Sequence, residues 1–375
     1  MARSDHLFFN GDNLQGIIDK TNYIQNLGAT AVWITPPVAN LWFSDGSSLT
    51  SYHGYWTRHF KKVDEHLGSL ETYKALSSNL HNKGMYLVQD IVVNHVGRYY
   101  QYKGNYDPEN TAHNFEYLEG NLPSKNPTQY PFNLNDRNNA EHVKADIYHW
   151  TPEIKDYNDP IQEALYQLAG LNDLNTSNHL VRETLKESYG YWIKEVGVDA
   201  FRLDTAKFVE HDYLNDFIHS DNGILATAAK TGRHSFPIFG EIFEIPAAMD
   251  NSAELKIASF QGTDSKPELN AVIGFPLYEA ISRVFSQGRP TSYLSYRLTN
   301  QMNIYKNPYM VANFVDNHDV QRFLAKSNLA SLKQAYALIM TVPGIPVIYQ
   351  GDEQVFEQTR RSMFKGGYLS DEDQF

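Results

Sequence analysis

Four apolar segments of the sequence end in acidic residues, and carboxyl groups placed in this way could carry acid–base or nucleophilic chemistry. The acidic residues are Asp90, Asp204, Glu241 and Asp319. In a parallel barrel, catalytic groups come from the carboxyl ends of several strands. One acidic residue at a strand end is often part of a structural salt bridge, but four such ends together favour an active site.

The alternation of side chains along a strand places Arg202 beside Asp204. Residues two apart point to the same face of a strand, so the segment Val198–Asp204 directs both side chains the same way. A neighbouring guanidinium favours the ionised carboxylate and lowers its pKa, as a nucleophile requires at neutral pH. By the same count Asp90 shares its face with Asn94, and we expect Asp90 to reach Arg202 from the neighbouring strand and fix it.

Glu241 differs from Asp204 in its surroundings, because Phe239, Ile242 and Phe243 flank it. An apolar environment raises the pKa of a carboxyl group. Glu241 is therefore the candidate for a group that carries a proton at neutral pH.

The elements that must position these residues are apolar segments of strand length, which alternate with amphipathic stretches along the chain. This alternation predicts a parallel sheet covered by helices. Helical spacing of apolar residues is found in the stretches 14–27 and 185–196. The seven predicted strand segments are Ala29–Pro36, Met85–Val93, Val198–Asp204, Pro237–Ile242, Val272–Leu277, Met310–Val315 and Ile345–Tyr349.

The fold class that this pattern predicts is α/β, with a (β/α)8 barrel of the TIM type. Seven recognisable strands leave the barrel one strand short, so we expect its first strand to be missing or truncated. Residues 97–160 interrupt the alternation, because they are rich in Tyr, Asn, Asp and Pro and lack sustained periodicity. They predict a loop-rich subdomain inserted after the third barrel strand. The barrel itself would then comprise residues 1–96 and 161–375.

The composition restricts the possible partners. The chain has 44 acidic and 32 basic residues, which give a net charge of −12. Phosphate recognition calls for a basic surface, so we expect no nucleic-acid partner. No apolar run is long enough for a membrane span. Aromatic residues make up 13% of the chain and could stack against sugar rings, so an uncharged polymer is the easier substrate.

At these residues the sequence resembles the alpha-amylase family, glycoside hydrolase family 13. The resemblance extends over essentially the whole chain. Its motifs are Gly28–Pro37, Tyr52–Trp56, the four strand ends named above, and Gly344–Glu353. Seven motifs in the family's order are far more specific than any one of them. Relatives usually carry a C-terminal β-sandwich, which we expect to be missing or truncated here.

The resemblance implies roles for the acidic residues. Asp204 would attack the anomeric carbon and form a β-glycosyl enzyme, while Glu241 protonates the leaving oxygen and later deprotonates the acceptor. Asp319 would bind the distorted sugar and stabilise the cationic transition state. Asp90 would support the site through Arg202, which would hold the nucleophile.

The resemblance also implies contacts to the substrate. His95 and His318 would donate hydrogen bonds to the same sugar ring as Asp319. Tyr55 would stack on the sugar beside the cleaved bond, and Lys207 would contact sugar on the leaving-group side. Two further candidates for substrate contact are His53 and Trp56, of which Trp56 could equally be a core aromatic.

A calcium ion is a further expectation from the resemblance. Family members often bind calcium between the barrel and the inserted domain, through hard oxygen ligands. Asn94 and Asp173 match ligand positions, and the third ligand would be the backbone carbonyl of Phe208, where many relatives have His. An ordinary hydrogen-bonding role for Asn94 is the alternative.

The function expected from these observations is hydrolysis of α-1,4 bonds in starch or maltodextrin with retention of the anomeric configuration. Cleavage within the polymer chain, or endo action, is the leading hypothesis. The alternatives within the family are a maltodextrin glucosidase, a cyclomaltodextrinase and a transglycosylase. A catalytically silent carbohydrate-binding protein would be expected to have lost at least one of the three carboxylates. We expect a monomer whose partner is an α-glucan polysaccharide or maltooligosaccharide. The polymeric substrate predicts a secreted or periplasmic location.

Overall fold

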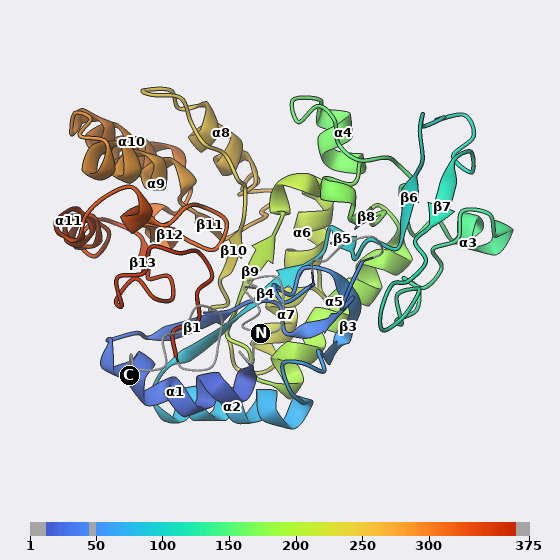
Figure 1. The fold of residues 1–375 in the computed structure, drawn as a ribbon, viewed down its shortest axis with the longest axis horizontal. Helices are drawn as coiled ribbons and strands as arrows, with labels where there is room; N and C mark the ends of the chain where they lie inside the picture. Colours follow the sequence, from blue (N-terminus) through green and yellow to red (C-terminus); the bar gives the residue numbers. More distant parts are fainter. Residues whose placement is uncertain (1–12, 45–49, 365–375) are drawn as a thin grey trace, which may run out of the picture. The chain divides into compact units, whose positions relative to one another are not determined.

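The computed structural model describes residues 13–44 and 50–364, which belong to two compact units (Figure 1). The N-terminal unit contains the described residues up to Pro237, and the C-terminal unit begins at Ile238. Asp90 and Asp204 belong to the N-terminal unit, whereas Glu241 and Asp319 belong to the C-terminal unit.

The N-terminal unit is built on three parallel strands in the order β1 (Ala31–Ile34), β4 (Tyr86–Val92) and β9 (Ala200–Asp204). The register of β4 and β9 pairs Asp90 with Arg202 and Val92 with Asp204. Parallel neighbours in register end at the same edge of a sheet. The polar residues at the ends of these two strands are therefore neighbours, as the sequence predicted.

Helices cover this sheet. Asn13 caps α1 (Leu14–Asn26) by accepting the Gly16 N–H, and Ser69 caps α2 (Leu70–Asn82) in the same way, because a side-chain oxygen satisfies a free N–H of the first turn. α1 and α2 lie side by side (Figure 1). The remaining helices of the unit are α3 (Ala140–Ala145), α4 (Pro160–Leu165), α5 (His179–Glu195), α6 (His211–His219) and α7 (Ile224–Ala229), with 3-10 turns at Leu168–Gly170 and Ala206–Phe208.

Tyr189 of α5 links this helix to the end of β4. Its hydroxyl accepts the Val92 N–H at 3.0 Å and donates to the Val92 carbonyl. The apolar side chains Leu185 and Trp192 are buried on the same helix. The helical spacing predicted for residues 185–196 is confirmed, and so is that of 14–27, although each helix ends one residue before the predicted end.

The segment 97–160 contains little regular structure. β6 (Tyr100–Tyr102) and β7 (Phe115–Tyr117) form an antiparallel pair, and buried Tyr100 packs against Phe115 and Trp150 with ring centroids 5.0 and 5.5 Å apart. The assignment of residues 97–160 as an inserted subdomain stays a prediction. The short strands of the N-terminal unit outside this segment are β2 (Val38–Asn40) paired with β3 (Thr57–Val63), and β5 (His95–Val96) paired with β8 (Asn172–Asp173).

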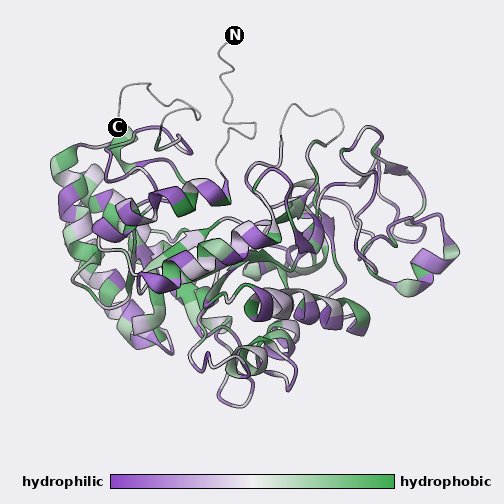
Figure 2. Cartoon of the chain, turned by 90° about the horizontal axis from the view of Figure 1, so that it is seen from below, coloured by the Kyte–Doolittle hydropathy of each residue, from purple (hydrophilic) through white to green (hydrophobic). Residues whose placement is uncertain are grey.

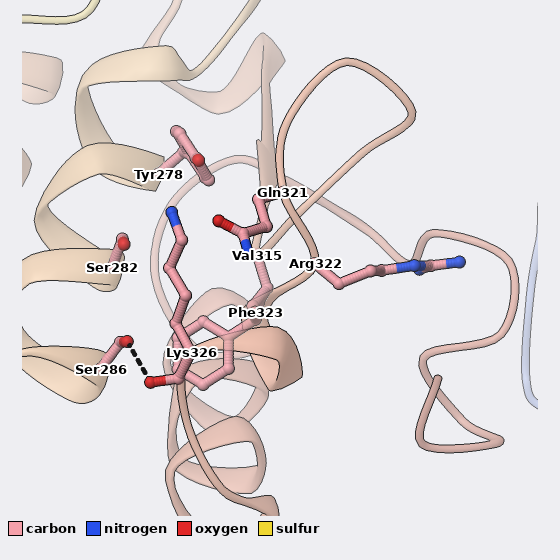
Figure 3. Close-up of a pocket in the computed structure, with 8 residues that line it drawn as sticks. All are labelled: Tyr278, Ser282, Ser286, Val315, Gln321, Arg322, Phe323 and Lys326. Carbon is pink, nitrogen blue, oxygen red and sulfur yellow. Dashed lines mark hydrogen bonds between the residues drawn. The ribbon is translucent and has the colours of Figure 1, made fainter. Parts of the chain in front are cut away.

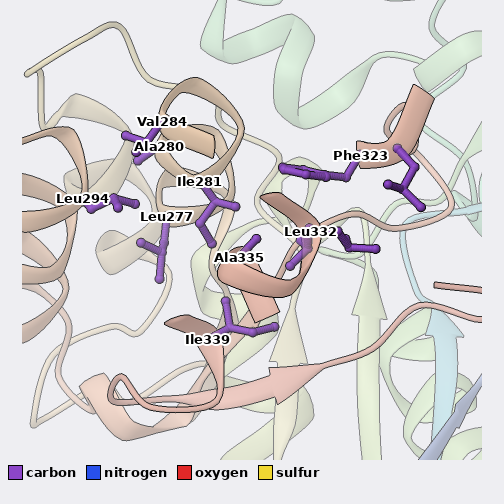
Figure 4. Close-up of a cluster of buried hydrophobic side chains, with 11 residues drawn as sticks. Leu277, Ala280, Ile281, Val284, Leu294, Phe323, Leu332, Ala335 and Ile339 are labelled. Carbon is purple, nitrogen blue, oxygen red and sulfur yellow. The ribbon is translucent and has the colours of Figure 1, made fainter. Parts of the chain in front are cut away.

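The C-terminal unit contains four parallel strands in chain order, which are β10 (Ile238–Gly240), β11 (Ala271–Ile273), β12 (Val311–Phe314) and β13 (Ile345–Val347). Its α-helices are α8 (Ser252–Ser259), α9 (Phe275–Ile281), α10 (Ser292–Ile304) and α11 (Leu329–Ile339), and a π-helical turn, Ser282–Ser286, continues α9. Leu277 and Ile281 of α9 face Leu332 and Ile339 of α11 in one apolar cluster (Figure 4). This cluster also includes Phe323, which follows β12 in the chain.

One predicted strand segment is partly wrong. Within Val272–Leu277 the strand ends at Ile273, and residues from Phe275 onward form α9. Pro276 lies in the first turn of this helix, where its fixed φ and missing N–H are tolerated, whereas the same residue would remove a hydrogen bond from a central strand. The continuously apolar sequence predicts a single strand, whereas the segment contains the end of a strand and the start of a helix.

Each of the seven predicted strand segments contains a parallel strand, which supports the α/β sheet expected for a barrel. The first strand, predicted to be missing or truncated, concerns residues 1–12, which lie outside the described residues. Apolar and polar residues alternate around the helices in Figure 2, as surface helices require. Across residues 13–44 and 50–364 no helix is both long and apolar enough to span a membrane.

Candidate active site

Arg202 lies between two carboxylates at the end of the N-terminal sheet. Its Nη1 donates to Asp204 Oδ1 at 2.6 Å and to Asp90 Oδ1 and Oδ2 at 3.0 and 3.2 Å. Arg202 is 1% exposed, Asp90 0% and Asp204 7%. Water therefore screens these charges little, and the contacts are charge-assisted hydrogen bonds. The structure brings together the three residues that alternation and register had predicted.

Asp90 also receives hydrogen bonds from two aromatic residues. Trp33 Nε1 donates to Asp90 Oδ2 at 3.2 Å, and the Tyr55 hydroxyl donates to the same oxygen at 2.8 Å. The Arg202 guanidinium carbon lies 5.6 and 5.7 Å from the two ring centroids, within the range of cation–π attraction. Sequence reasoning missed Trp33. The one signal was its place in a predicted strand next to β4.

His95 is buried, and both of its ring nitrogens face protein partners. Its Nε2 lies 3.2 Å from the Tyr55 carbonyl, which can only accept, so Nε2 carries the hydrogen. Its Nδ1 accepts from the Asn94 side chain at 3.3 Å. Burial lowers the pKa of His95 to about 4, so the ring is neutral at pH 7. In this arrangement His95 positions Tyr55, and a direct contact to sugar stays a prediction.

His53 and Trp56 surround Tyr55. His53 Nδ1 accepts the Tyr55 N–H at 3.1 Å, and the two rings are stacked with centroids 5.6 Å apart. The Trp56 ring meets His53 edge-on at 5.2 Å. The Trp56 N–H donates to Asn40 at 2.7 Å, which ties this segment to β2. These residues form one aromatic group, and their contact with substrate stays a prediction.

Lys207 follows β9 in the turn Ala206–Phe208. Its Nζ lies 3.3 Å from Glu163 Oε2, and both side chains are largely shielded from solvent. The Phe208 ring is edge-on to Tyr157 at 6.4 Å. α4, which carries Glu163, therefore packs on the turn that follows Asp204.

Asn94 and Asp173, the predicted calcium ligands, are neighbours at the β5–β8 pair, and the Asn94 side chain is hydrogen-bonded to Asp173. His149 Nδ1 lies 2.6 Å from Asp173 Oδ2, and its Nε2 is 4.0 Å from Glu210. Burial opposes a charge on His149, but the hydrogen bond and charge of Asp173 and the charge of Glu210 raise its pKa. Calcium takes roughly six to eight oxygen ligands, and one of the Asp173 oxygens, Oδ2, is engaged by His149 in this structure.

Within the part of the chain that the structure describes, no group of three or more His, Asp or Glu is arranged to hold a metal ion. The residues therefore fit calcium only in part. The ligand set with the Phe208 carbonyl stays a prediction, and so does the alternative hydrogen-bonding role of Asn94.

Glu241 directly follows β10 in the C-terminal unit and is 7% exposed. An added Cβ at Gly240 would lie 2.1 Å from Leu269 Cδ1, so glycine is needed for this apolar side chain to approach the strand beside Glu241. Phe243 is 40% exposed and packs against Phe275 with centroids 4.6 Å apart. Glu241 is thus shielded, although Phe243 is less enclosed than the sequence suggested.

Asp319 and His318 follow β12. His318 Nε2 lies 3.1 Å from Asp319 Oδ2, and Arg360 Nη2 lies 3.4 Å from Asp319 Oδ1. Arg360 Nε also donates to the His318 carbonyl at 3.1 Å. Asp319 is the most exposed of the three predicted catalytic carboxylates. Sequence reasoning missed Arg360, which lies in a segment without strand or helix periodicity.

The predicted convergence of Asp204, Glu241 and Asp319 around one sugar stays a prediction, because Asp204 belongs to the other unit. Within each unit carboxyl groups follow parallel strands, and those of Asp204 and Glu241 are shielded from solvent, whereas Asp319 is exposed. Such groups could act as nucleophile, general acid and electrostatic stabiliser.

Known proteins are similar to this chain over most of its length. A family model described as the alpha-amylase catalytic domain matches residues 3–372. The chain is 31% identical over 364 residues to a beta/alpha-amylase of Paenibacillus polymyxa, covering 94% of this chain and 25% of that protein. It is 29% identical to a cyclomaltodextrin glucanotransferase of Klebsiella oxytoca, covering 92% of this chain and 52% of that protein.

A solved structure extends this likeness to the fold. The alpha-amylase from Geobacillus thermoleovorans, complexed with acarbose, matches with a TM-score of 0.73 and 27% identity. The match covers 95% of this chain and 69% of that chain.

Proposed function

This chain belongs to the alpha-amylase family of glycoside hydrolases, and we propose that it is a retaining α-glucan hydrolase that cleaves α-1,4-glucosidic bonds of starch or maltodextrin. The observation that carries the proposal is the Asp90–Arg202–Asp204 group at the end of the parallel strands β4 and β9. A shielded guanidinium beside Asp204 favours its ionised form, which is the form that attacks.

In the proposed mechanism Asp204 displaces the leaving sugar from the anomeric carbon and forms a covalent glycosyl enzyme. Glu241 donates its proton to the glycosidic oxygen, and then takes a proton from the water that releases the sugar. Two inversions give net retention. Asp319 would bind hydroxyls of the distorted ring, with His318 and Arg360 holding its carboxylate.

The test is the product formed from maltooligosaccharides, followed by NMR at the anomeric carbon. We expect the α-anomer first, and a β-anomer would exclude retention. Glu241→Gln is expected to remove most hydrolysis of starch, and an unchanged rate would show that Glu241 is not the acid/base. A rapid fall in starch viscosity relative to the reducing ends formed would support endo action over exo action.

Transglycosylation is the second candidate function. The similarity to a cyclomaltodextrin glucanotransferase over 92% of this chain favours it. In that case an acceptor sugar, in place of water, would give its proton to Glu241. Cyclic or elongated products from starch, separated by chromatography, would distinguish this activity from hydrolysis and from the glucosidase and cyclomaltodextrinase alternatives.

Calcium held by Asn94, Asp173 and the Phe208 carbonyl is a further proposal, supported by the adjacency of the two side chains. We expect chelation to lower the melting temperature and added calcium to restore it. A melting temperature that does not respond would assign Asn94 and Asp173 to an ordinary hydrogen-bond network with His149. The polymeric substrate supports a secreted or periplasmic location.

A further inference from the structure

A second arginine between two carboxylates lies in the C-terminal unit, and we propose that it positions the segment that carries His318 and Asp319. The Arg322 cluster, as we name it, consists of Asp316, Arg322, Tyr336 and Asp352. Arg322 Nη1 lies 3.1 Å from Asp352 Oδ1 and 3.4 Å from Asp316 Oδ1. This inference rests on the proposed function, because it assigns the cluster to the alignment of Asp319.

The Arg322 cluster closes the segment 316–323 on itself. Asp316 follows β12, and its Oδ2 accepts the Phe323 N–H at 2.7 Å, while its Oδ1 faces Arg322. His318 and Asp319 lie between these two anchoring points in the chain. A segment tied at both ends loses few conformations when substrate binds, which is how a positioning group assists catalysis.

The same arginine ties this segment to the one that follows β13. Arg322 Nε donates to the Gln358 carbonyl at 3.3 Å, and Nη2 donates to the Gln350 carbonyl. The guanidinium lies 3.9 Å from the centroid of the Tyr349 ring. Arg360, which contacts His318 and Asp319, belongs to the segment held in this way. Two sides of the Asp319 surroundings therefore depend on Arg322.

A small cavity lies beside Arg322, but it does not explain the direction of the arginine side chain. It is lined by Tyr278, Gln321 and Lys326 among others, and its volume of about 10 Å³ is about what one water molecule needs. Lys326 extends into it, whereas Arg322 points away from it (Figure 3). The Arg322 guanidinium instead contacts the carboxylates and backbone carbonyls on its other side.

The charges of the cluster make its state depend on pH. Two buried carboxylates face one guanidinium, so burial and the charge of Asp316 raise the pKa of Asp352 to about 8, and burial also raises that of Asp316. The other titratable groups that face them are Tyr336, Tyr278 and Tyr349, whose pKa values burial raises further above the usual range. Burial and the closeness of the two carboxylates therefore favour one proton on the pair.

The bound proton determines whether the contribution of the cluster to stability rises or falls with pH. A carboxyl group with a raised pKa binds its proton more tightly in the folded than in the unfolded state, so its contribution to stability is full below about pH 4 and is lost as pH rises to about 8. Asp352→Asn mimics the protonated form at every pH. We expect the melting temperature of this variant to fall less between pH 5 and pH 9 than that of the wild type.

The decisive experiment compares Arg322→Lys, Asp352→Asn and a control, Asp212→Asn. Asp212 pairs with Arg182 on the surface and is 68% exposed. Hydrogen exchange of residues 316–323 and starch hydrolysis are measured for each purified protein, well below its melting temperature. We expect Arg322→Lys to exchange faster at 316–323, with exchange at 200–204 unchanged, and to lower kcat by about 10- to 100-fold. The control should match the wild type.

The pH profile separates positioning from a purely structural role. The ratio of kcat in Asp352→Asn to kcat in the wild type is expected to rise between pH 6 and pH 9. Unchanged exchange at 316–323 in Arg322→Lys would overturn the positioning role, and a ratio that stays flat with pH would overturn the pH dependence of the cluster. A wild type without hydrolytic activity but with faster exchange in Arg322→Lys would instead contradict the proposed function.

Discussion

Arg202 in the N-terminal unit and Arg322 in the C-terminal unit each face two carboxylates through Nη1, yet the two groups are built differently. Arg322 also donates to two backbone carbonyls and lies 3.9 Å from the centre of one aromatic ring. Arg202 has rings about 5.6 and 5.7 Å away, and Trp33 and Tyr55 direct their donors to Asp90. Both groups are buried.

This difference shows that an arginine between two acids does not define a role by itself. Backbone carbonyls bound to Arg322 join chain segments, which is a structural task. Trp33 and Tyr55 donate from their side chains to one carboxylate, Asp90, while Asp204 contacts the arginine at 2.6 Å. Substitutions in and around the two groups test this difference.

The largest effect is expected from Asp204→Asn, because the amide cannot form the glycosyl enzyme. We expect kcat on maltooligosaccharides to fall by about 10⁴-fold or more. Asp352→Asn at pH 6 is the matched control from the other group and should keep most of its activity. Similar losses in the two variants would remove the distinction between the groups.

Arg322→Met should reduce stability strongly, because it leaves buried carboxylates without their cation. Breaking a buried ion pair costs about 3–5 kcal/mol, measured here as the free energy of unfolding in urea. Lys125→Met removes the partner of Glu119 in a surface pair whose side chains are 68% and 75% exposed, and should cost less than about 1 kcal/mol. Equal losses would show that the Arg322 cluster contributes no more than a surface pair.

Tyr55→Phe tests whether the donors on Asp90 matter for catalysis. The variant keeps the ring but removes the hydroxyl that donates to Asp90 at 2.8 Å. Hydrogen bonds to charged groups contribute about 1.5–3 kcal/mol, so we expect kcat/KM to fall by about tenfold or somewhat more. Tyr130→Phe, at an exposed tyrosine, is the control. A wild-type kcat/KM in Tyr55→Phe would limit Tyr55 to stacking.

The smallest effect is expected from Glu163→Gln, which replaces a carboxylate that lies 3.3 Å from Lys207 Nζ by an amide of similar shape. The amide oxygen can still accept a hydrogen bond from Lys207, so KM should change by no more than a few-fold while kcat is kept. A loss as large as that of Tyr55→Phe would place Glu163 among the residues that align the site.

The Asp90–Arg202–Asp204 group could be predicted because its geometry follows from the repeat of a strand. Side chains two apart share a face, and parallel neighbours in register place Asp90 opposite Arg202. The Arg322 cluster and Arg360 could not be predicted in this way. Their contacts join loops after β12 and β13, and loop conformation leaves no period in the sequence.

Three other differences have separate causes. The run Val272–Leu277 is continuously apolar, and only Pro276 indicates that a helix begins within it. The contact of His149 with Asp173 could not be predicted, because the two residues are 24 positions apart and their contact depends on how the intervening segment folds. Trp33 resembles any core tryptophan until its Nε1 is seen to face Asp90.

The Tyr189 hydroxyl is bound to both backbone groups of Val92, the last residue of β4. Val92 is also the residue that pairs with Asp204 in the neighbouring strand. A side chain from α5, 97 positions later in the chain, therefore holds the end of the strand beside the predicted nucleophile. We expect a substitution that removes this hydroxyl to loosen the end of β4 without touching any residue of the sheet.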